Sequence, residues 1–470
     1  MQIFQPSFYC LLLLLVLGSQ ELQGQSKVFV ELIQFEGNKR TKEKTMIREL
    51  TFNQGDSILI SDLTQIVEES RQRLRNTTLF SKVESKIGDW SSTDKVIIKF
   101  IVREQWYFTG FGIFDLADRN FNVWWVEQDH RLDRVDYGFR VKHDNLTGNA
   151  DELTAAMTLG YTRRFEIEYK LPAINDARTL GLHTKLFSSQ RREINFDTFG
   201  NKFEFFEGED FQLKTFIAEL GLSYRKKLDS FHAVDLEFHQ NQSSDTLSRI
   251  LNPDFFLNAR SEQQILTLAY TLTVDKRKQR PYSKAGWYLQ TTLKKHGLGI
   301  FKDLDALTLS TTFAKYFEFS PKLSLETIGK VYFFFNRDQQ PYHNSRALGL
   351  KPDFLSGYEF YVIDGMDYTY LKTSMRYQIV DLEWSFKKIK LFEKMRLFPM
   401  PLQVYLTLNN DVGYVNDPFY AQFNPLSNTV LWGGGIGIDI VAYYDKIFQI
   451  QYSFNHLLES GIFLHFKHRF

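Results

Sequence analysis

The sequence is poor in cysteine, in proline and in long apolar runs. Its 470 residues include one Cys, at position 10, and 11 Pro. A chain with a single thiol forms neither an internal disulfide nor a site of several cysteine ligands, which excludes a disulfide scaffold and a zinc-finger protein. The net charge of +1 lacks the basic excess of a nucleic-acid-binding surface, so no nucleic-acid partner is expected. Beyond the N-terminus, no segment approaches the roughly 20 apolar residues of a membrane-spanning helix.

The N-terminus holds the longest apolar run, FYCLLLLLVL at residues 8–17, followed by small and polar residues. This run is too short to span a bilayer but suits a signal-peptide core, so residues 1–25 are predicted to be a signal peptide of an exported chain. No Lys or Arg precedes the run, and a buried strand or helix is the alternative interpretation. Cys10 precedes the leucines, which argues against a lipoprotein anchor, and the mature chain would contain no thiol.

Aromatic residues are abundant, at 16% of the chain with 44 Phe and 23 Tyr. The mean hydropathy is nevertheless −0.31. Both a soluble β-protein and a membrane barrel have such a composition, because each alternates apolar and polar side chains along its strands.

Residues 26–104 predict a small α+β domain. A strand ends at the Gly37-Asn38 turn, and two helices follow, the second with Leu63, Val67 and Leu74 on one face. The stretches LFSKVESKI and VIIKFIVRE complete the domain as two strands. The predicted order is strand, helix, helix, strand, strand, with no catalytic constellation among the charged residues.

From residue 105 to 470 the helical pattern disappears and alternating segments recur. In QVYLTLNNDV (403–412), Leu406 and Leu408 share one face, and Thr407, Asn409 and Asp411 share the other. About sixteen such segments, many longer than the usual five or six residues, fit strands that cross an outer membrane with apolar residues outward. An even number keeps both ends of the barrel on one side of the membrane, so residues 118–129 are assigned to the first extracellular loop or a strand extension. The fold class is therefore an all-β transmembrane barrel of about sixteen antiparallel strands after an α+β domain.

The final stretch, SGIFLHFKHRF, shows the same period of two. Ile462, Leu464, Phe466 and Phe470 lie on one face, which lipid would cover, and barrel closure would remove the exposed edge.

Residues 26–104 resemble a POTRA (polypeptide-transport-associated) domain through FEGNKRTKEKTMIREL, a Gly-Asp pair, RLRNTTLFSKV and VIIKFIVRE, in that order. The remaining chain resembles the BamA/TamA family of outer-membrane assembly and translocation barrels. Four stretches carry this resemblance: HDNLTGNADEL, through Asn145, Leu146 and Gly148; VDKRKQRPYSKAG, a periplasmic-turn motif through Asp275, Arg277, Pro281 and Gly286; FLSGYEFYVIDG, at the family's inward-folded loop; and GGGIGIDIVAYYDKIFQIQYSFN with the terminal strand.

The resemblance implies a barrel that inserts or translocates client polypeptides by strand templating. The first strand, near residues 106–114, would meet the last, 462–470, at a seam weakened by Gly110, Gly112 and Gly461. Phe470, with Phe466 on the same face, would be a C-terminal insertion signal. The implied partners are outer-membrane lipid, an unfolded client polypeptide or nascent barrel, and periplasmic chaperones or accessory subunits. The location would be the outer membrane of a Gram-negative bacterium, with the POTRA domain in the periplasm.

The inward-folded loop departs from the family pattern, because it reads Ser356-Gly357-Tyr358 where the family has an arginine first. In the family, that arginine pairs with an acid on a barrel strand. The stretch NNDVGYV resembles this strand, and Asp411 stands at the position of the acid. A buried carboxylate needs a cation or several donors. Either water solvates Asp411, or a nearby base substitutes; the candidates are Arg376 first, then Arg346 and Lys351.

Two other functional classes remain open. A passive or gated pore would need an unobstructed lumen, which the long loop at 337–367 disfavours. An enzyme is not expected, since the chain has no Gly-x-Ser-x-Gly or His-Glu-x-x-His motif. Its 10 His lack metal-ligand spacing, so neither a metal nor a cofactor is expected.

Overall fold

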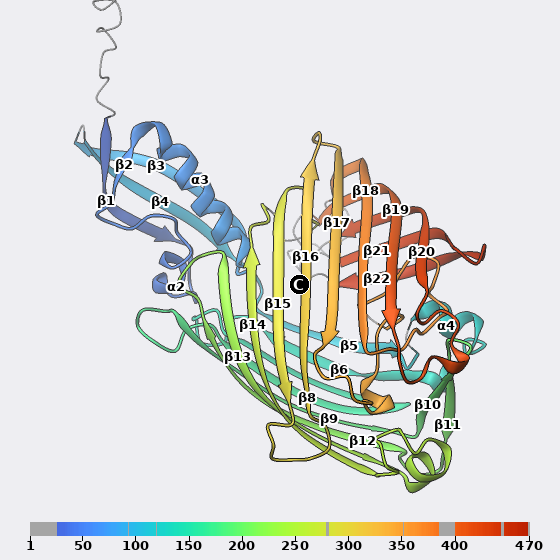
Figure 1. Ribbon diagram of the computed structural model, residues 1–470. Coiled ribbons are helices and arrows are strands. Elements are labelled where there is room, and N and C mark those ends of the chain that lie inside the picture. Colours follow the sequence, from blue (N-terminus) through green and yellow to red (C-terminus); the bar gives the residue numbers. More distant parts are fainter. Residues whose placement is uncertain are drawn as a thin grey trace, which may run out of the picture. The chain divides into compact units, whose positions relative to one another are not determined.

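The computed structural model describes residues 26–92, 94–118, 120–278, 282–350, 352–384, 400–442 and 446–468. Two compact units divide the chain between Gln105 and Trp106 (Figure 1). The predicted signal peptide lies outside the described residues, as do Pro281, Lys351 and Phe470. For Phe466 only the backbone is described.

The first unit is a four-stranded sheet with two helices. Its elements are β1 (Lys27–Glu36), α2 (Glu43–Ile47), β2 (Ser57–Leu59), α3 (Ile60–Asn76), β3 (Phe80–Ser92) and β4 (Lys95–Glu104). The sheet order is β2-β1-β4-β3, with β1 parallel to β4. The predicted element order is found, with the short strand β2 added between the helices. Leu63, Val67 and Leu74 of α3 are buried, as the spacing predicted, and so are Ile98 and Phe100 of β4.

The second unit is a 16-stranded antiparallel sheet. Its strands are β5 (Phe108–Leu116), β6 (Val135–His143), β7 (Glu152–Gly160), β8 (Thr162–Leu171), β9 (Leu180–Arg191), β12 (Leu213–Tyr224), β13 (Ser230–Ser243), β14 (Glu262–Asp275), β15 (Gly286–His296), β16 (Ala306–Glu318), β17 (Leu323–Phe334), β18 (Asp367–Trp384), β19 (Met400–Asn416), β20 (Val430–Ala442), β21 (Lys446–Asn455) and β22 (Ser460–His468). Each strand pairs with its neighbours along the chain, except that β9 pairs with β12. The predicted fold class and strand number are confirmed.

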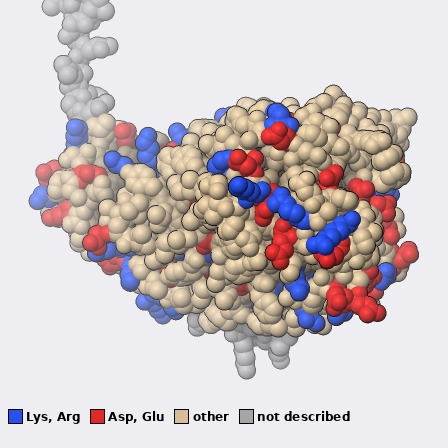
Figure 2. Space-filling model, turned by 60° about the horizontal axis from the view of Figure 1, so that its bottom comes forward, with Lys and Arg blue, Asp and Glu red and all other residues tan. Residues whose placement is uncertain are grey.

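Alternation along the strands separates an apolar outer face from a polar inner face. On β19, Leu406 and Leu408 are 49% and 57% exposed, whereas Thr407 and Asp411 are 1% and 2% exposed. Apolar side chains on the outside of a sheet are stable where lipid covers them. Figure 2 shows broad areas of the surface that carry neither acidic nor basic side chains. Within the described ranges, no helix has both the length and the apolar character needed to cross a membrane.

Among the described residues, the longest connections between strands lie at one end of the barrel, which we call the loop end. Turns such as residues 225–229 and 319–322 lie at the other end, which we call the turn end. The loop end carries the hairpin of β10 (Glu193–Phe199) and β11 (Lys202–Glu207), the π-helix η2 (Thr246–Leu251) and the 3-10 helices η1 (Leu132–Arg134), η3 (Tyr342–Asn344) and η5 (Ala421–Phe423). Residues 118–129, predicted as loop or strand, contain the helix α4 (Phe121–Val126). The Asn120 side chain caps this helix by accepting the backbone N–H of Val123 at 2.9 Å.

The connection between β17 and β18, residues 335–366, folds into the barrel, and we call it the lumen loop. Its apolar residues form a core with side chains of the barrel wall: Ala347, Leu348, Leu355, Tyr358 and Ile363 pack with Tyr368, Tyr370, Val415, Leu426 and Leu431. This part of the lumen is thus occupied by chain that packs against the wall as a protein interior does.

Candidate functional site: the lumen loop and the seam

The Ser356-Gly357-Tyr358 segment fastens the lumen loop to strands β19 to β21. Ser356 donates to one oxygen of Asp411 twice, from its backbone N–H and from its hydroxyl, both at 2.9 Å. Gln451 of β21 donates to the same hydroxyl oxygen at 2.8 Å. A serine therefore supplies two of the donors that a buried carboxylate needs, without carrying a charge.

Glycine at position 357 is required by backbone geometry. Its φ of +83° lies in the left-handed region, and a Cβ there would stand 2.5 Å from the carbonyl oxygen of Phe454. Asn455, the next residue of β21, donates to the Gly357 carbonyl at 2.8 Å. The loop backbone therefore lies directly against the wall, closer than any other residue type permits.

Tyr358 forms the third attachment, through its hydroxyl group. The hydroxyl donates to the carbonyl of Trp432 at 3.0 Å and accepts the Trp432 N–H at 3.1 Å. It also contacts Nδ1 of His456. The three motif residues thus bond to three strands of the wall without a charged side chain.

The base nearest Asp411 is Lys372 of β18, whose Nζ lies 3.6 Å from the carboxylate. A base therefore lies beside Asp411, as the substitution hypothesis requires, but it is none of the described candidates: Arg376 and Arg346 pair with other acids, and Lys351 lies outside the described residues. The sheet register places Lys372 opposite Asp411, whereas Arg376 lies opposite Thr407 and forms an ion pair with Glu326. Arg346 forms an ion pair with Asp364 of the lumen loop at 2.8 Å.

At the turn end, the β14–β15 connection brings Asp275, Arg277 and Gly286 together. Arg277 donates to both oxygens of Asp275, each at 2.8 Å, in the bidentate geometry that favours arginine. Gly286 has a φ of +104°, in the left-handed region that glycine adopts without strain. The turn also directs Tyr282 inward, where its hydroxyl donates to Asp439 of β20 at 2.9 Å. The role of Tyr282 was not predicted from the sequence. The only local signal was its position directly after Pro281 of the periplasmic-turn motif.

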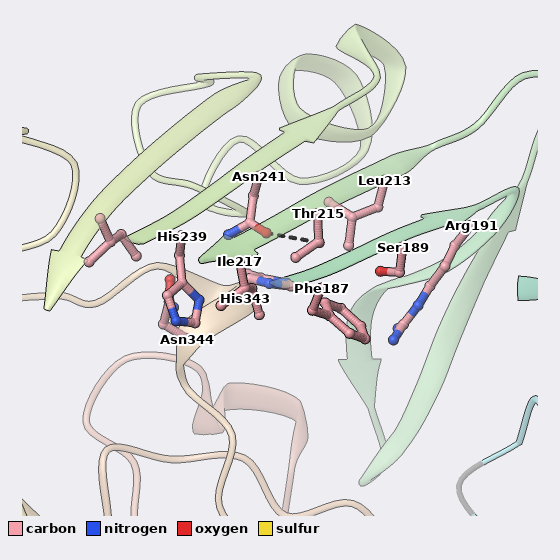
Figure 3. Close-up of a pocket in the computed structure, with 11 residues that line it drawn as sticks. Phe187, Ser189, Arg191, Leu213, Thr215, Ile217, His239, Asn241, His343 and Asn344 are labelled. Carbon is pink, nitrogen blue, oxygen red and sulfur yellow. Dashed lines mark hydrogen bonds between the residues drawn. The ribbon is translucent and has the colours of Figure 1, made fainter. Parts of the chain in front are cut away.

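Cavities lie between the barrel wall and the loops, and two of those lined by described residues concern the lumen loop. One, of about 270 Å³, lies between β9, β12 and β13 of the wall and His343 and Asn344 of the lumen loop (Figure 3). The other, of about 620 Å³, is lined by Val123 of α4, by Gln128 and Arg134, and by residues of the β10–β11 hairpin. Both are pockets beside the packed lumen loop.

The seam is the boundary between β5 and β22, the two end strands of the sheet. In the described part of both strands, no ladder of backbone pairs joins them. Gly110 and Gly112 of β5 have open space where a Cβ would stand, while a Cβ at Gly461 would press on the Phe463 ring at 3.0 Å. Ile462 is 69% exposed and Phe463 only 3%, so β22 alternates as predicted, with an aromatic on its inner face.

A side chain of α4 occupies the edge of β22. The Asn122 carbonyl oxygen accepts the backbone N–H of Leu464 at 3.1 Å, and its amide donates to the Leu464 carbonyl at 3.5 Å. In an antiparallel pair, alternate residues direct both backbone groups away from their partner strand. The Asn122 amide binds both groups of Leu464, as a neighbouring strand would.

The lumen loop supports this contact from inside. Asn120 donates to the Glu359 carbonyl at 2.9 Å, and the Glu359 carboxylate lies 3.2 Å from Nε2 of His465. The rings of Phe360 and Phe463 lie 5.3 Å apart. The lumen loop, α4 and β22 therefore form one connected contact network, which we call the seam network. No spacing in the sequence indicated it.

Comparisons with known proteins agree with this architecture. The model of the POTRA domain, surface antigen variable number repeat, matches residues 28–105, and that of the Omp85 superfamily domain matches residues 145–345. The fold is similar to BamA from Haemophilus ducreyi lacking POTRA domains 1-3, with 14% identity and a TM-score of 0.53 over 93% of this chain and 84% of that one. It is also similar to CdiB from Escherichia coli, with 12% identity and a TM-score of 0.57 over 94% and 74%. CdiB from Acinetobacter baumannii has 12% identity and a TM-score of 0.51 over 94% and 73%. No curated protein matches the sequence.

Proposed function

Because the chain is a BamA/TamA-like protein of the Omp85 family with a single POTRA domain, we propose that it assists the insertion or translocation of client polypeptides at the outer membrane. The client is an unfolded polypeptide or nascent barrel, which the POTRA domain receives and the seam templates. Periplasmic chaperones or accessory subunits deliver it, and the chain itself catalyses no covalent chemistry.

The observation that carries this proposal is the edge of β22. A strand edge that no strand covers presents backbone N–H and C=O groups, to which an extended chain adds by β-augmentation. At Leu464 these groups bind one side-chain amide, that of Asn122. An incoming strand offers a backbone partner along its whole length, so it competes favourably with a single amide.

The proposed orientation follows from the connections. The POTRA domain precedes β5, so the turn end would face the periplasm and the loop end would face outward. A client delivered from the periplasm would then reach the turn end of the seam first.

A passive pore is the second candidate, and the lumen loop packed against the wall disfavours it. In the described residues, the lumen loop contacts the wall at the loop end and Tyr282 bonds to Asp439 at the turn end. Single-channel recording separates the two, because a pore gives large stable currents, whereas a gated translocator gives small flickering ones.

Cross-linking the seam network tests the proposal in cells. Cysteines replace Asn122 and Leu464, and a short bis-maleimide joins them; the only natural cysteine, Cys10, lies in the predicted signal peptide. Cells that contain only the linked protein should have the same outer-membrane proteome as cells depleted of the protein, because the edge of β22 no longer opens.

The matched control links Ile438 to Ile450, which lie opposite one another on the paired strands β20 and β21 and face outward. This link joins strands that are already hydrogen-bonded and should leave the proteome unchanged. A normal outer membrane in cells whose Asn122–Leu464 pair is fully linked would show that clients do not use the seam.

A further inference from the structure

Four ionisable side chains meet on the inner wall near the turn end. They come from four neighbouring strands: Glu168 of β8, His183 of β9, Glu219 of β12 and Asp235 of β13. The spacing of histidines in the sequence predicted no metal site. The strand register assembles one set of donors, because His183 lies opposite Gly221 and Gly221 lies opposite Asp235.

Both nitrogens of the His183 ring face carboxylates. Nε2 lies 3.0 Å from an oxygen of Glu168, while Nδ1 lies 3.2 Å from an oxygen of Glu219 and 3.9 Å from one of Asp235. One ligand atom each from His183, Glu219 and Asp235 lies within 4.8 Å of the other two.

The hydrogen bond to Glu168 determines what Nδ1 can do. Glu168 is held in place by Lys170, whose Nζ lies 2.9 Å from the same carboxylate. A neutral imidazole that donates from Nε2 has its lone pair on Nδ1. That lone pair then points at two negatively charged oxygens, so a cation is needed between them, either a proton on Nδ1 or a metal ion. A carboxylate behind the second ring nitrogen is also the partner that metal-binding histidines use to fix the tautomer.

Gly221 provides the space in which these donors converge. A Cβ at this position would overlap the Asp235 carboxylate and would lie 3.5 Å from Cβ of His183. The missing side chain lets His183 and Asp235 approach each other across β12. The neighbouring Lys185 lies 3.5 Å from Glu166 and so belongs to another pair.

We propose that Nδ1 of His183 and the carboxylates of Glu219 and Asp235 bind a first-row divalent transition-metal ion, Zn²⁺ in the first instance. Tetrahedral zinc with bonds of about 2.0–2.2 Å separates its ligand atoms by about 3.4 Å, between the 3.2 Å and 3.9 Å found here. One nitrogen and two oxygens suit such an ion, and water from the lumen completes the coordination. Glu168 is a positioning residue, because it acts through His183.

Metal titration of the full chain tests this proposal. The tag-free protein, purified in detergent and stripped with a chelator, is titrated with Zn²⁺ against a fluorescent competitor, and with Co²⁺ followed by its visible absorption. We expect one equivalent to bind. His183→Ala should abolish this binding, and Glu168→Gln should weaken it about 10- to 100-fold, the usual effect of losing such a partner. Gly221→Ala should weaken it without removing any donor.

The matched control is His239→Ala. His239 also faces the lumen on β13, 3.3 Å from Glu237, but the ammonium of Lys294 lies 2.9 Å from that carboxylate and already supplies its cation. This variant should bind Zn²⁺ as the wild type does. Heat-modifiable gel migration shows which variants fold. If His183→Ala does not fold, the Zn²⁺ affinity of the isosteric variant Glu168→Gln tests the proposal instead. Absence of one-equivalent binding in the wild type would mean that a proton on Nδ1 is the only cation, and would overturn the proposal. Equal affinity of Glu168→Gln and the wild type would also overturn it.

Discussion

Replacing Ser356 by alanine should weaken the docking of the lumen loop while leaving the barrel intact. The substitution removes one hydroxyl group, which donates to Asp411 and accepts from Gln451. The backbone N–H of residue 356 still donates to Asp411, because alanine retains it. The loop therefore keeps its position but loses two of its attachments to the wall.

The magnitude follows from those two hydrogen bonds. A bond to a charged group contributes about 1.5–3 kcal/mol and a neutral one about 0.5–1.5 kcal/mol. Their loss makes docking of the loop less favourable by about 2–4.5 kcal/mol. Since each 1.4 kcal/mol corresponds to a factor of ten, the ratio of undocked to docked loop should rise about 30- to 1,600-fold.

Planar-bilayer recording and limited proteolysis measure this change. Ser356→Ala should increase the frequency of open events and expose residues 335–366 to protease, with normal heat-modifiable migration of the barrel. Ser345→Ala is the matched control, because the Ser345 hydroxyl donates within the same loop, to the Pro341 carbonyl at 3.1 Å. If both variants record and digest like the wild type, the hydrogen bonds of Ser356 do not hold the loop.

Three further predictions concern other parts of the chain. Asp411→Asn should raise channel noise with little effect on barrel insertion, because the amide loses the charge that binds Ser356 and Lys372; bilayer recording and gel migration measure both effects. Residues 28–103 should unfold cooperatively when expressed alone, since about 75 residues suffice for a marginal core; an aggregated product without a thermal transition would contradict this. Deletion of Phe470 should lower the outer-membrane level far more than synthesis or export, as cell fractionation would show, and substitution of His468 should have a milder effect.

The strand number was predictable because lipid imposes a simple rule on each strand. Residues that face lipid, such as Leu406 and Leu408, must be apolar, and the residues between them are polar. The period of two can therefore be recognised in each strand without knowledge of its neighbours. The α3 helix was predictable for the same reason, since one buried face determines its pattern.

The partner of Asp411 was not predictable, because it depends on register between strands. Arg376 and Lys372 share one face of β18, four residues apart, and at about 3.4 Å per residue they differ by about 14 Å along the strand. Register is set by turn geometry and by irregularities such as the shift between Gln378 and Val380, neither of which the spacing of residues reveals. The His183 cluster escaped notice for the same reason, as its members are scattered along the chain.

The helix α4 was not predicted from the sequence, for a different reason. Its sequence, FNVWWV, is rich in the aromatic and branched residues that favour strands. The Asn120 cap and tertiary contacts with β22 outweigh that weak preference. Asparagine three residues before Val123 was the local signal available.

The contacts along the two routes out of the barrel differ in number and in charge. Opening the axial route requires undocking a loop held by Ser356 and Tyr358, and also by Asp353, which binds Lys330 at 2.6 Å and accepts hydrogen bonds from Tyr368 and Tyr370. Opening the lateral route at Leu464 requires displacement of the Asn122 amide and of the Glu359–His465 and Phe360–Phe463 contacts, and an incoming strand would replace the backbone bonds that are lost. Under the proposed function the client compensates the second cost and nothing compensates the first, so the described contacts would favour lateral passage over axial flow.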